Sequence, residues 1–396
     1  MDYKYTLIQD NVDPAAPEEN AQQAPIGSAL PESGPDHSEK LQNEMNIKAA
    51  RRAVSRNGIN LSAFLICANA AAILIELLAL TVFVFIQVMH GITDKEAVMD
   101  NLSALLSRGN NTAIFTGLLN IVSMHIIAFF AFCIMGIGMK RRNYKKSGLG
   151  VGRFIALIPI ALFLMSIGSF IGDSLNSIIS SLLNLNVSNS TIETIESMPL
   201  WLAALATMVC APIVEEFIFR YTLVGTLGRF GNVFAILISS VAFGLFHGNL
   251  YQFFYAFLVG LVLGYVYVKC GRWWVCVLMH AIVNFFGGVL PMMIEKAMTR
   301  SEVLKNLANA GEDVNKFALF FNEAAVYSYT VLSLVIFSLG MALTVVALAK
   351  KWHKIENDPE IPLPKGSVGK VVFSNVGTII FLTFSAIFFA LTIAIL

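Results

Sequence analysis

The stretch Pro212-Ile213-Val214-Glu215-Glu216-Phe217-Ile218-Phe219-Arg220 places three ionisable side chains inside an apolar run from about 201 to 227. A run of this length can cross a bilayer as one helix. A charged side chain at the centre of such a helix costs roughly 2.5–3.5 kcal/mol on insertion scales, so it usually faces protein or a water-filled cavity and marks a functional site. The stretch therefore predicts a membrane helix that carries a polar site.

The spacing within this stretch separates the two glutamates. Glu216 and Arg220 are four residues apart, so they share one helix face and can form an ion pair. Glu215 is rotated from Glu216 by about 100° and is free to face another partner. Pro212 lacks a backbone donor, which predicts a local kink just before the carboxylates. We interpret Glu216 as a structural carboxylate held by arginine and Glu215 as a chemical one.

Composition sets the class of protein. Hydrophobic residues make up 56% of the 396 and charged residues only 13%, and the mean hydropathy is +0.70. Soluble domains are about 25% charged. We expect an all-α, polytopic integral membrane protein that contacts the lipid bilayer and binds no nucleic acid. The five cysteines lie in or beside apolar runs without close-set metal-ligand pairs, which indicates buried free thiols.

Nine apolar runs predict about nine membrane-spanning helices. They cover approximately residues 59–89, 113–139, 153–182, 199–227, 232–248, 250–269, 274–294, 326–349 and 371–396. Lys and Arg gather in alternate connections, so the positive-inside rule predicts a cytoplasmic N-terminus and, with nine spans, a C-terminus outside. These basic residues are Lys140, Arg141, Arg142, Lys145, Lys146, Arg229, Lys269, Arg272, Lys350, Lys351 and Lys354.

The runs divide the chain into five parts. The first, 1–46, is an acidic segment rich in Pro, Gln and Ser, which predicts a disordered cytoplasmic tail without a signal peptide. The others are three N-terminal spans (47–198), a core of four spans (199–294), an extracytoplasmic loop or cap (295–325) and two C-terminal spans (326–396).

Two further polar clusters follow the first within the four-span core. Phe243 and His247 are four residues apart at the end of the fifth run, and His280 and Asn284 share one face of the seventh. Between them, Gly260 and Gly264 on the sixth run form a small-xxx-small pair that permits close helix approach. We therefore expect helices four to seven to bring the three clusters together.

These motifs resemble a known family. Glu-Glu-x-x-x-Arg, Phe-x-x-x-His and His-x-x-x-Asn, in this order on successive membrane helices, are similar to those of the CAAX-protease and bacteriocin-processing (CPBP, or Abi) family, and in particular to its type II CAAX prenyl protease group. These proteins are intramembrane glutamate-type endopeptidases. The resemblance covers about residues 199–290. Tyr221 departs from it, because family members often carry glycine after the arginine.

The resemblance implies an endopeptidase that cleaves a membrane-associated peptide or protein. Its catalytic residues would be Glu215, His247, His280 and Asn284, with Glu216, Arg220 and Phe243 in support. A desolvated glutamate is a suitable base for activating water. In this scheme His247 orients the water, while His280 and Asn284 donate hydrogen bonds to the oxyanion, as the family's proposed mechanism has it.

Helix arithmetic tests whether these side chains lie at one depth. At 1.5 Å per residue, Glu215 lies about 18 Å from the cytoplasmic face, His247 about 23 Å and Asn284 about 15 Å. His280 comes out shallower, at about 9 Å. The seventh helix must therefore tilt or begin deeper than its apolar run indicates.

Other interpretations of the polar residues remain open. We expect no cofactor, but Glu215, His247 and His280 form an acceptable zinc ligand set. A catalytically inactive scaffold, or a transporter using the intramembrane charges, is the alternative function. Glu76, His125 and Asp173 match no motif, and we expect them to pack helices or line a cavity. A bacterial cell membrane is the expected location, and the substrate remains open.

Overall fold

The structure, a computed structural model, describes residues 35–145, 148–184, 190–310 and 314–394, and every regular element within them is a helix. The chain divides into two units, residues 1–42 and 43–396. Of the first unit, the structure describes only residues 35–42, the opening turns of helix α1.

The α-helices are α1 (Pro35–Met89), α2 (Lys95–Ser107), α3 (Asn111–Asn120), α4 (Phe129–Met135), α5 (Val151–Leu183), α6 (Ser190–Ser197), α7 (Leu200–Ala204), α8 (Ala211–Glu216), α9 (Gly225–Leu227), α10 (Asn232–Phe246), α11 (Leu250–Cys270), α12 (Trp273–Asn284), α13 (Leu290–Asn309), α14 (Lys316–Ala349), α15 (Val368–Phe373) and α16 (Val376–Ala394). Four π-helical segments, η1 (Ile121–Ala128), η2 (Leu205–Cys210), η3 (Phe217–Val224) and η5 (Phe285–Val289), and one 3₁₀ turn, η4 (Gly228–Phe230), join them.

Long apolar helices confirm the all-α membrane fold. Within the described residues, seven helical stretches are long and apolar enough to cross a membrane. They are His37–Met89, Asn111–Met135, Val151–Leu183, Leu200–Phe230, Leu250–Cys270, Trp273–Asn309 and Lys316–Ala349. The fifth and ninth predicted spans are shorter apolar helices, Asn232–Phe246 and Val376–Thr392, so the number nine stays a prediction.

The N-terminal boundary predicted from composition is wrong over residues 35–46. These residues are helical, because α1 begins at Pro35. Proline is well tolerated in the first turn of a helix, where its missing N–H has no partner to lose. Lys40, Glu44 and Lys48 follow at four-residue spacing, which favours helix through opposite charges on one face. The rest of the predicted tail, 1–34, lies outside the described residues.

The segment 295–325, which we expected to form a loop or cap, is mostly helical. It contains the end of α13 and the beginning of α14. Lys305 of α13 and Glu323 of α14 form an ion pair with an N–O distance of 2.5 Å. The two helices therefore form one antiparallel hairpin that extends the neighbouring spans.

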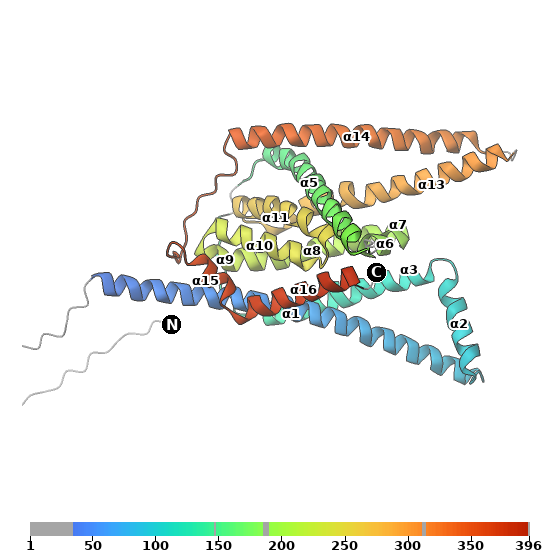
Figure 1. The fold of residues 1–396 in the computed structure, drawn as a ribbon, viewed down its shortest axis with the longest axis horizontal. Helices are drawn as coiled ribbons and strands as arrows, with labels where there is room; N and C mark the ends of the chain where they lie inside the picture. The colour runs from blue at the N-terminus through green and yellow to red at the C-terminus, as the bar shows by residue number, and fades with distance from the viewer. Residues whose placement is uncertain (1–34, 146–147, 185–189, 311–313, 395–396) are drawn as a thin grey trace, which may run out of the picture. The chain divides into compact units, whose positions relative to one another are not determined.

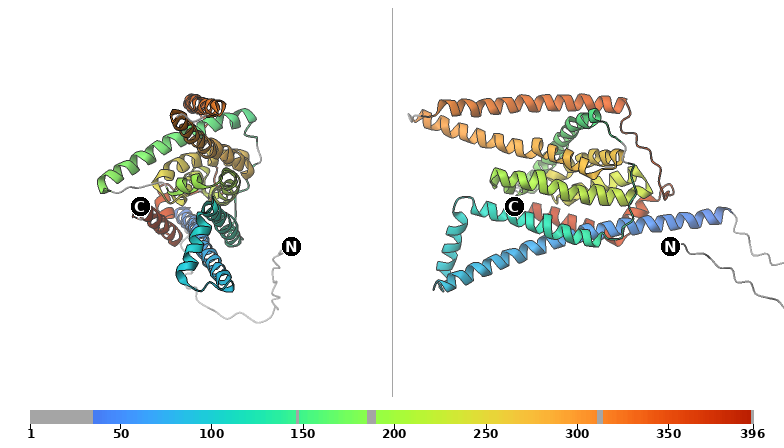
Figure 2. Two further views of the ribbon diagram at one scale, coloured as in Figure 1. Left: turned by 90° about the vertical axis from the view of Figure 1, so that its right-hand side faces the viewer. Right: turned by 180° about the vertical axis from the view of Figure 1, so that it is seen from behind.

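Helices α10 and α11 pack together in the middle of unit 43–396 (Figures 1 and 2). α14 lies on one side of them, and α16 with the part of α1 after residue 42 lies on the other (Figure 1). Helix α5 crosses α11 and packs against it over a long contact. The largest buried cluster joins side chains of α5, α11 and α12, including Leu162, Leu263 and Met279. Of the motif-bearing helices, α10 and α12 contribute to this cluster, and α8 contributes Val214 to a second one.

Glycines set the close helix contacts around α11. A Cβ at Gly260 would lie 3.2 Å from Ser240 of α10, and one at Gly264 would lie 3.0 Å from Ile236, as the small-xxx-small pair predicts. On the other side, a Cβ at Gly168 of α5 would lie 2.4 Å from the Cα of Tyr255. Helix α11 is therefore held between two neighbours that approach its backbone closely.

Two connections brace one end of the bundle, where η3 leads into α10. The backbone N–H of Arg142 donates to the carbonyl of Gly225 at 2.7 Å, and the Tyr144 hydroxyl lies 3.0 Å from Oδ1 of Asn232. Burial raises the pKa of Tyr144 well above its ordinary value, so its hydroxyl stays protonated and donates this bond. Asn357 accepts from the backbone N–H of Asn232 at 2.8 Å. The turn after η3 is thereby fixed from both sides.

The α5–α11 contact gives a stability prediction. Gly168→Ala places a methyl group against the Tyr255 backbone, and such overpacking typically costs about 1–3 kcal/mol. We expect a lower Tm for the purified protein in detergent. Gly152→Ala in the same helix is the control, because a Cβ there meets nothing within 4 Å. Equal Tm values for the two variants would contradict the packing described here.

Candidate active site

The helix that carries both glutamates is wound unevenly. α8 lies between two π-helical segments, η2 before it and η3 after it. The backbone N–H of Ala211 bonds to the carbonyl of Ala206, which is the i→i−5 pattern of a π-helix. Continuing this pattern would pair Thr207 with Pro212, which has no N–H. The sequence thus frees the Thr207 carbonyl one turn before Pro212 and about two turns before the carboxylates.

Asn284 takes up this free carbonyl. Its side-chain Nδ2 donates to the Thr207 oxygen at 2.7 Å and so joins the end of α12 to η2. The bond uses one of the two N–H groups of the Asn284 amide. It fixes how deeply α12 sits beside α8, which decides where His280, one turn earlier, can reach.

Glu216 and Arg220 form the ion pair that their spacing predicts. Nε of Arg220 lies 3.2 Å from Oε2 of Glu216, and the two side chains are 1% and 0% exposed. Among the described residues, none of the three guanidinium nitrogens of Arg220 has a hydrogen-bond partner of good geometry. The guanidinium instead lies over the ring of Phe243, 4.6 Å from its centroid, where the aromatic face attracts the cation.

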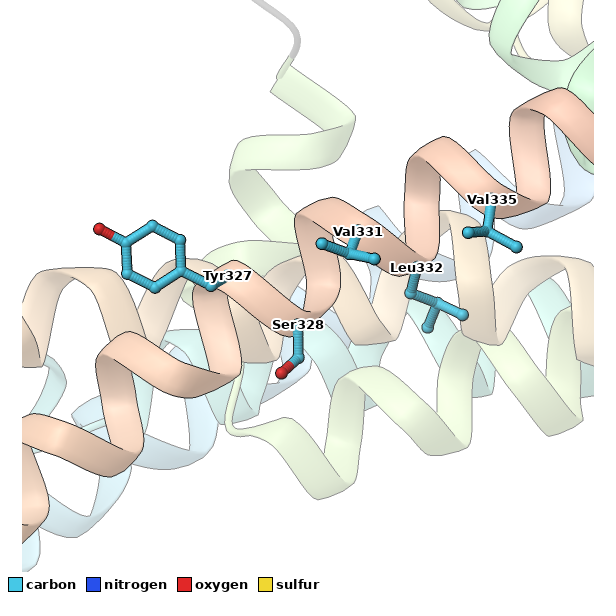
Figure 3. Close-up of a pocket in the computed structure, with 5 residues that line it drawn as sticks. All are labelled: Tyr327, Ser328, Val331, Leu332 and Val335. Atoms are coloured by element: carbon cyan, nitrogen blue, oxygen red, sulfur yellow. The ribbon is translucent and has the colours of Figure 1, made fainter.

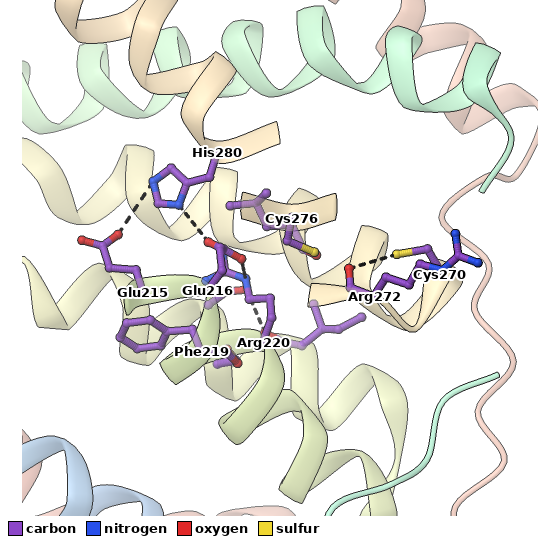
Figure 4. Close-up of polar contacts among 12 residues, drawn as sticks. Glu215, Glu216, Phe219, Arg220, Cys270, Arg272, Cys276 and His280 are labelled. Atoms are coloured by element: carbon purple, nitrogen blue, oxygen red, sulfur yellow. Dashed lines mark hydrogen bonds and ion pairs between the residues drawn. The ribbon is translucent and has the colours of Figure 1, made fainter. Parts of the chain in front are cut away.

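His280 lies between the two glutamates (Figure 4). Its Nδ1 is 2.8 Å from Oε1 of Glu216, and its Nε2 is 3.7 Å from Oε2 of Glu215. The first distance is a hydrogen bond in which Nδ1–H donates to the carboxylate, whereas the second exceeds hydrogen-bond length. His280 therefore reaches the depth of the glutamates, although counting along its apolar run placed it shallower.

His247 approaches from the end of α10. Its Nδ1 lies 2.9 Å from the carbonyl of Phe243, which favours a proton on Nδ1 and leaves Nε2 with a free lone pair. The Phe243 ring centroid is 5.0 Å from that of His247 and 5.8 Å from that of His280, both edge to face. The Phe243 ring thus contacts both imidazoles and the Arg220 guanidinium.

The structure adds one residue that motif reasoning did not place at the site. The ring of Tyr255, on α11, lies 6.2 Å from that of His247. An isolated Tyr in an apolar run gave no signal in the sequence.

Exposure separates the two carboxylates. The Glu215 side chain is 12% exposed, whereas that of Glu216 is completely buried. Glu215 is therefore partly accessible from outside the packed interior. A base that activates water needs such access.

Two surface hollows lie apart from the motif residues. One runs along α14 and is lined by Tyr327, Ser328, Val331, Leu332 and Val335 (Figure 3). The other is lined by Glu196, Glu295, Lys296, Thr299 and Arg300. Neither contains a residue of the three motifs, so the candidate site is the polar cluster on α8, α10 and α12.

The zinc alternative can be compared with this geometry. Glu215 and His280 approach each other, but among the described residues no three His, Cys, Asp or Glu side chains are grouped so that they could hold a metal ion. Nδ1 of His280 is also taken by Glu216. The side chains as they lie do not fit a three-ligand zinc site, and we derive no step through a metal.

Comparison with known proteins points to the same helices. Residues 197–286 match the family model described as "Type II CAAX prenyl endopeptidase Rce1-like". This segment contains all three motifs. The resemblance inferred from the motifs is therefore confirmed for this part of the chain.

Two curated relatives extend the similarity. "Putative membrane peptidase YdiL" of Bacillus subtilis is 30% identical over 156 residues, which are 39% of this chain and 62% of that protein. An uncharacterized protein of Mycoplasma capricolum is 27% identical over 213 residues, 49% of this chain and 61% of that protein. The chain thus spans about three fifths of the length of these relatives. No solved structure matches it.

The ion pair gives a prediction that separates the glutamates. Glu216→Gln leaves the buried guanidinium of Arg220 without its counter-charge, and breaking a buried pair costs about 3–5 kcal/mol. We expect a clear fall in yield and Tm, and a similar fall for Arg220→Leu.

Glu215→Gln is the matched control, since Glu215 has no arginine partner among the described residues and is partly exposed. Its Tm should stay close to that of the wild type. A stable Glu216→Gln protein beside an unstable Glu215→Gln protein would mean that the two carboxylates have been assigned in the wrong order.

Proposed function

We propose that this chain is an intramembrane endopeptidase in which Glu215 activates water to hydrolyse a peptide bond of a membrane-associated protein or peptide. The observation that carries the proposal is the position of His280, held by Glu216 and directed at the partly exposed Glu215. The family match over residues 197–286 supports the same class of reaction.

The reaction requires a base, an oriented water and stabilisation of an oxyanion. In our proposal Glu215 accepts a proton from water while the water oxygen attacks the carbonyl carbon. The C–N bond of the tetrahedral intermediate then breaks, and the proton passes from Glu215 to the leaving amine. Glu216 and Arg220 hold the site without touching the substrate.

The other motif residues fit into this scheme by position. The 3.7 Å separation between Nε2 of His280 and Oε2 of Glu215 is one at which a water can link both groups. His247 offers a free Nε2 once Nδ1 is bonded to the Phe243 carbonyl. The second N–H of Asn284 is available to an oxyanion, since only the first is donated to Thr207.

We further propose that the basic end of the bundle faces the cytoplasm, in a bacterial cell membrane. Arg142 bonds to the Gly228 carbonyl, Arg229 pairs with Glu360, and Lys269 bonds to the Lys354 carbonyl. These contacts gather the basic connections at one end. Concentration of Lys and Arg on one side is the pattern of cytoplasmic loops.

The decisive test compares wild type with Glu215→Gln. Gln keeps the shape and a hydrogen-bonding group but removes the proton acceptor, and loss of a general base typically lowers the rate about 10²–10⁴-fold. Both proteins are expressed in the same host, and new peptide termini among membrane proteins are mapped by mass spectrometry. Purified proteins in lipid nanodiscs are then assayed with farnesylated and unfarnesylated versions of one quenched CAAX-type peptide.

We expect cleavage products that depend on Glu215 and an unchanged Tm. Products made equally by a well-folded Glu215→Gln protein would overturn the mechanism. Identical sets of termini in cells that express wild type and in cells that express Glu215→Gln would instead favour the scaffold or transporter. Metal analysis of the active protein, with activity measured before and after chelator, tests the zinc alternative separately.

A pair of substitutions at His280 tests its two nitrogens. His280→Asn places an amide N–H near Nδ1 and retains the bond to Glu216, but it offers nothing at the position of Nε2. We expect near-normal Tm and loss of cleavage. His280→Leu removes both contacts and should lower Tm as well. Full activity of His280→Asn would show that Nε2 takes no part.

A further inference from the structure

The turn between α10 and α11 presents His247 to the site. Gly248 follows His247 in the left-handed region, with φ at +69°, and its N–H donates to the carbonyl of Leu245 at 3.1 Å. Asn249 then caps α11, and its Nδ2 donates back to the His247 carbonyl at 3.1 Å. Two residues therefore join the histidine to the next helix, so a movement of this turn also moves the imidazole.

Helix α16 contacts this turn from outside the segment that matches the family model. The match ends at residue 286, whereas α16 begins at Val376 and packs beside α10 (Figure 1). A Cβ at Gly248 would lie 3.3 Å from the Cβ of Phe388, so this side chain lies against the Gly248 backbone. The Thr392 hydroxyl lies 3.1 Å from the Gly248 carbonyl and 2.8 Å from the Phe388 carbonyl, and its one hydrogen can be donated to either. Both contacts fall on the residue that follows His247.

Helix α16 is itself held in place. Phe381 is 5% exposed and belongs to a buried cluster that contains Phe243, and Phe388 packs against the same cluster. Near the start of α16, the N–H of Gly377 donates to Oγ of Ser55 on α1 at 3.0 Å. The side chains that meet the turn therefore stand on a helix that is packed and bonded to two neighbours.

We propose that Phe388 and Thr392 are positioning residues of the hydrolytic site: they hold the Gly248 turn and so fix where His247 presents Nε2. The inference rests on the proposed function, and both residues act through His247. Displacing a catalytic group by 1 Å can cost about 10²-fold in rate, so a small movement of the turn is enough to lower activity.

The first arm of the test measures the turn without using activity. Amide hydrogen exchange of peptides covering residues 244–252 is followed by mass spectrometry for wild type, Phe388→Ala and Ile387→Ala in lipid nanodiscs. Ile387 is the matched control, because it is the neighbouring side chain on α16 and is 49% exposed.

We expect the turn amides of Phe388→Ala to exchange about tenfold faster, because loss of the packed ring favours local opening. Ile387→Ala should exchange at the wild-type rate, and α12 should be unchanged in both variants. Unchanged exchange at the turn in Phe388→Ala overturns the proposal. An equal rise in α12 also overturns it, because the effect would then be general.

The second arm measures cleavage by the monodisperse, folded fraction of each variant. Phe388→Ala should lower kcat about tenfold to 10²-fold with KM little changed, because the position of His247 and not substrate binding is affected. Phe388→Leu keeps an apolar side chain beyond Cβ and should recover most of this loss. No recovery in Phe388→Leu, or a wild-type kcat in Phe388→Ala, overturns the assignment of Phe388.

Thr392 is tested by a pair that differs in the hydroxyl. Thr392→Val removes the donor at nearly constant shape and should lower kcat, whereas Thr392→Ser retains the hydroxyl and should keep the wild-type kcat. Equal kcat values for the two variants overturn the assignment of Thr392.

The two arms keep the proposals distinguishable. If wild type forms no product beyond that of Glu215→Gln, the proposed function fails, while hydrogen exchange still decides whether α16 holds the turn. If wild type cleaves and both Phe388→Ala and Thr392→Val cleave equally well, the proposed function stands and the inference about α16 is wrong.

Discussion

The site depends on how a fully buried carboxylate is neutralised. Glu216 has no exposure at all, and an isolated charge there would be very costly. Arg220 on the same helix and His280 on another supply the two partners. Because His280 comes from α12, the requirement to satisfy Glu216 also fixes α12 against α8. A local electrostatic need thereby determines a tertiary contact.

A backbone carbonyl provides a second bond that holds α12 against the glutamate-bearing helix. Pro212 cannot donate, so the Thr207 carbonyl accepts from Asn284 instead. His280 and Asn284 are one turn apart, and both bond to the glutamate-bearing helix at neighbouring heights. Two bonds along one helix face define its depth and rotation together. Interruptions of regular winding near functional residues are common for this reason.

The sequence allowed the helical membrane fold, the Glu216–Arg220 pair and the close contact at Gly260 and Gly264 to be predicted, because each depends on local spacing or composition. The depth of His280 could not be predicted, since it depends on a bond between two helices. Tyr255 was missed for the same reason. The start of α1 was missed because the acidic, Pro-rich composition of residues 1–46 was given more weight than the four-residue spacing of opposite charges after Pro35.

The charges of the site limit what chemistry it can perform. In the proposed reaction both glutamates begin ionised, Arg220 protonated and His280 neutral, so the cluster of these four side chains begins with one net negative charge. One proton taken from water brings it to zero, wherever in the coupled cluster that proton resides. Without Arg220 the same step would begin from two net charges in a low-dielectric interior, where charge is far more costly. In the proposed reaction Arg220 therefore contributes without touching the substrate. Because of its charge, one proton, accepted from water and then given to the leaving amine, changes the net charge of the cluster between minus one and zero.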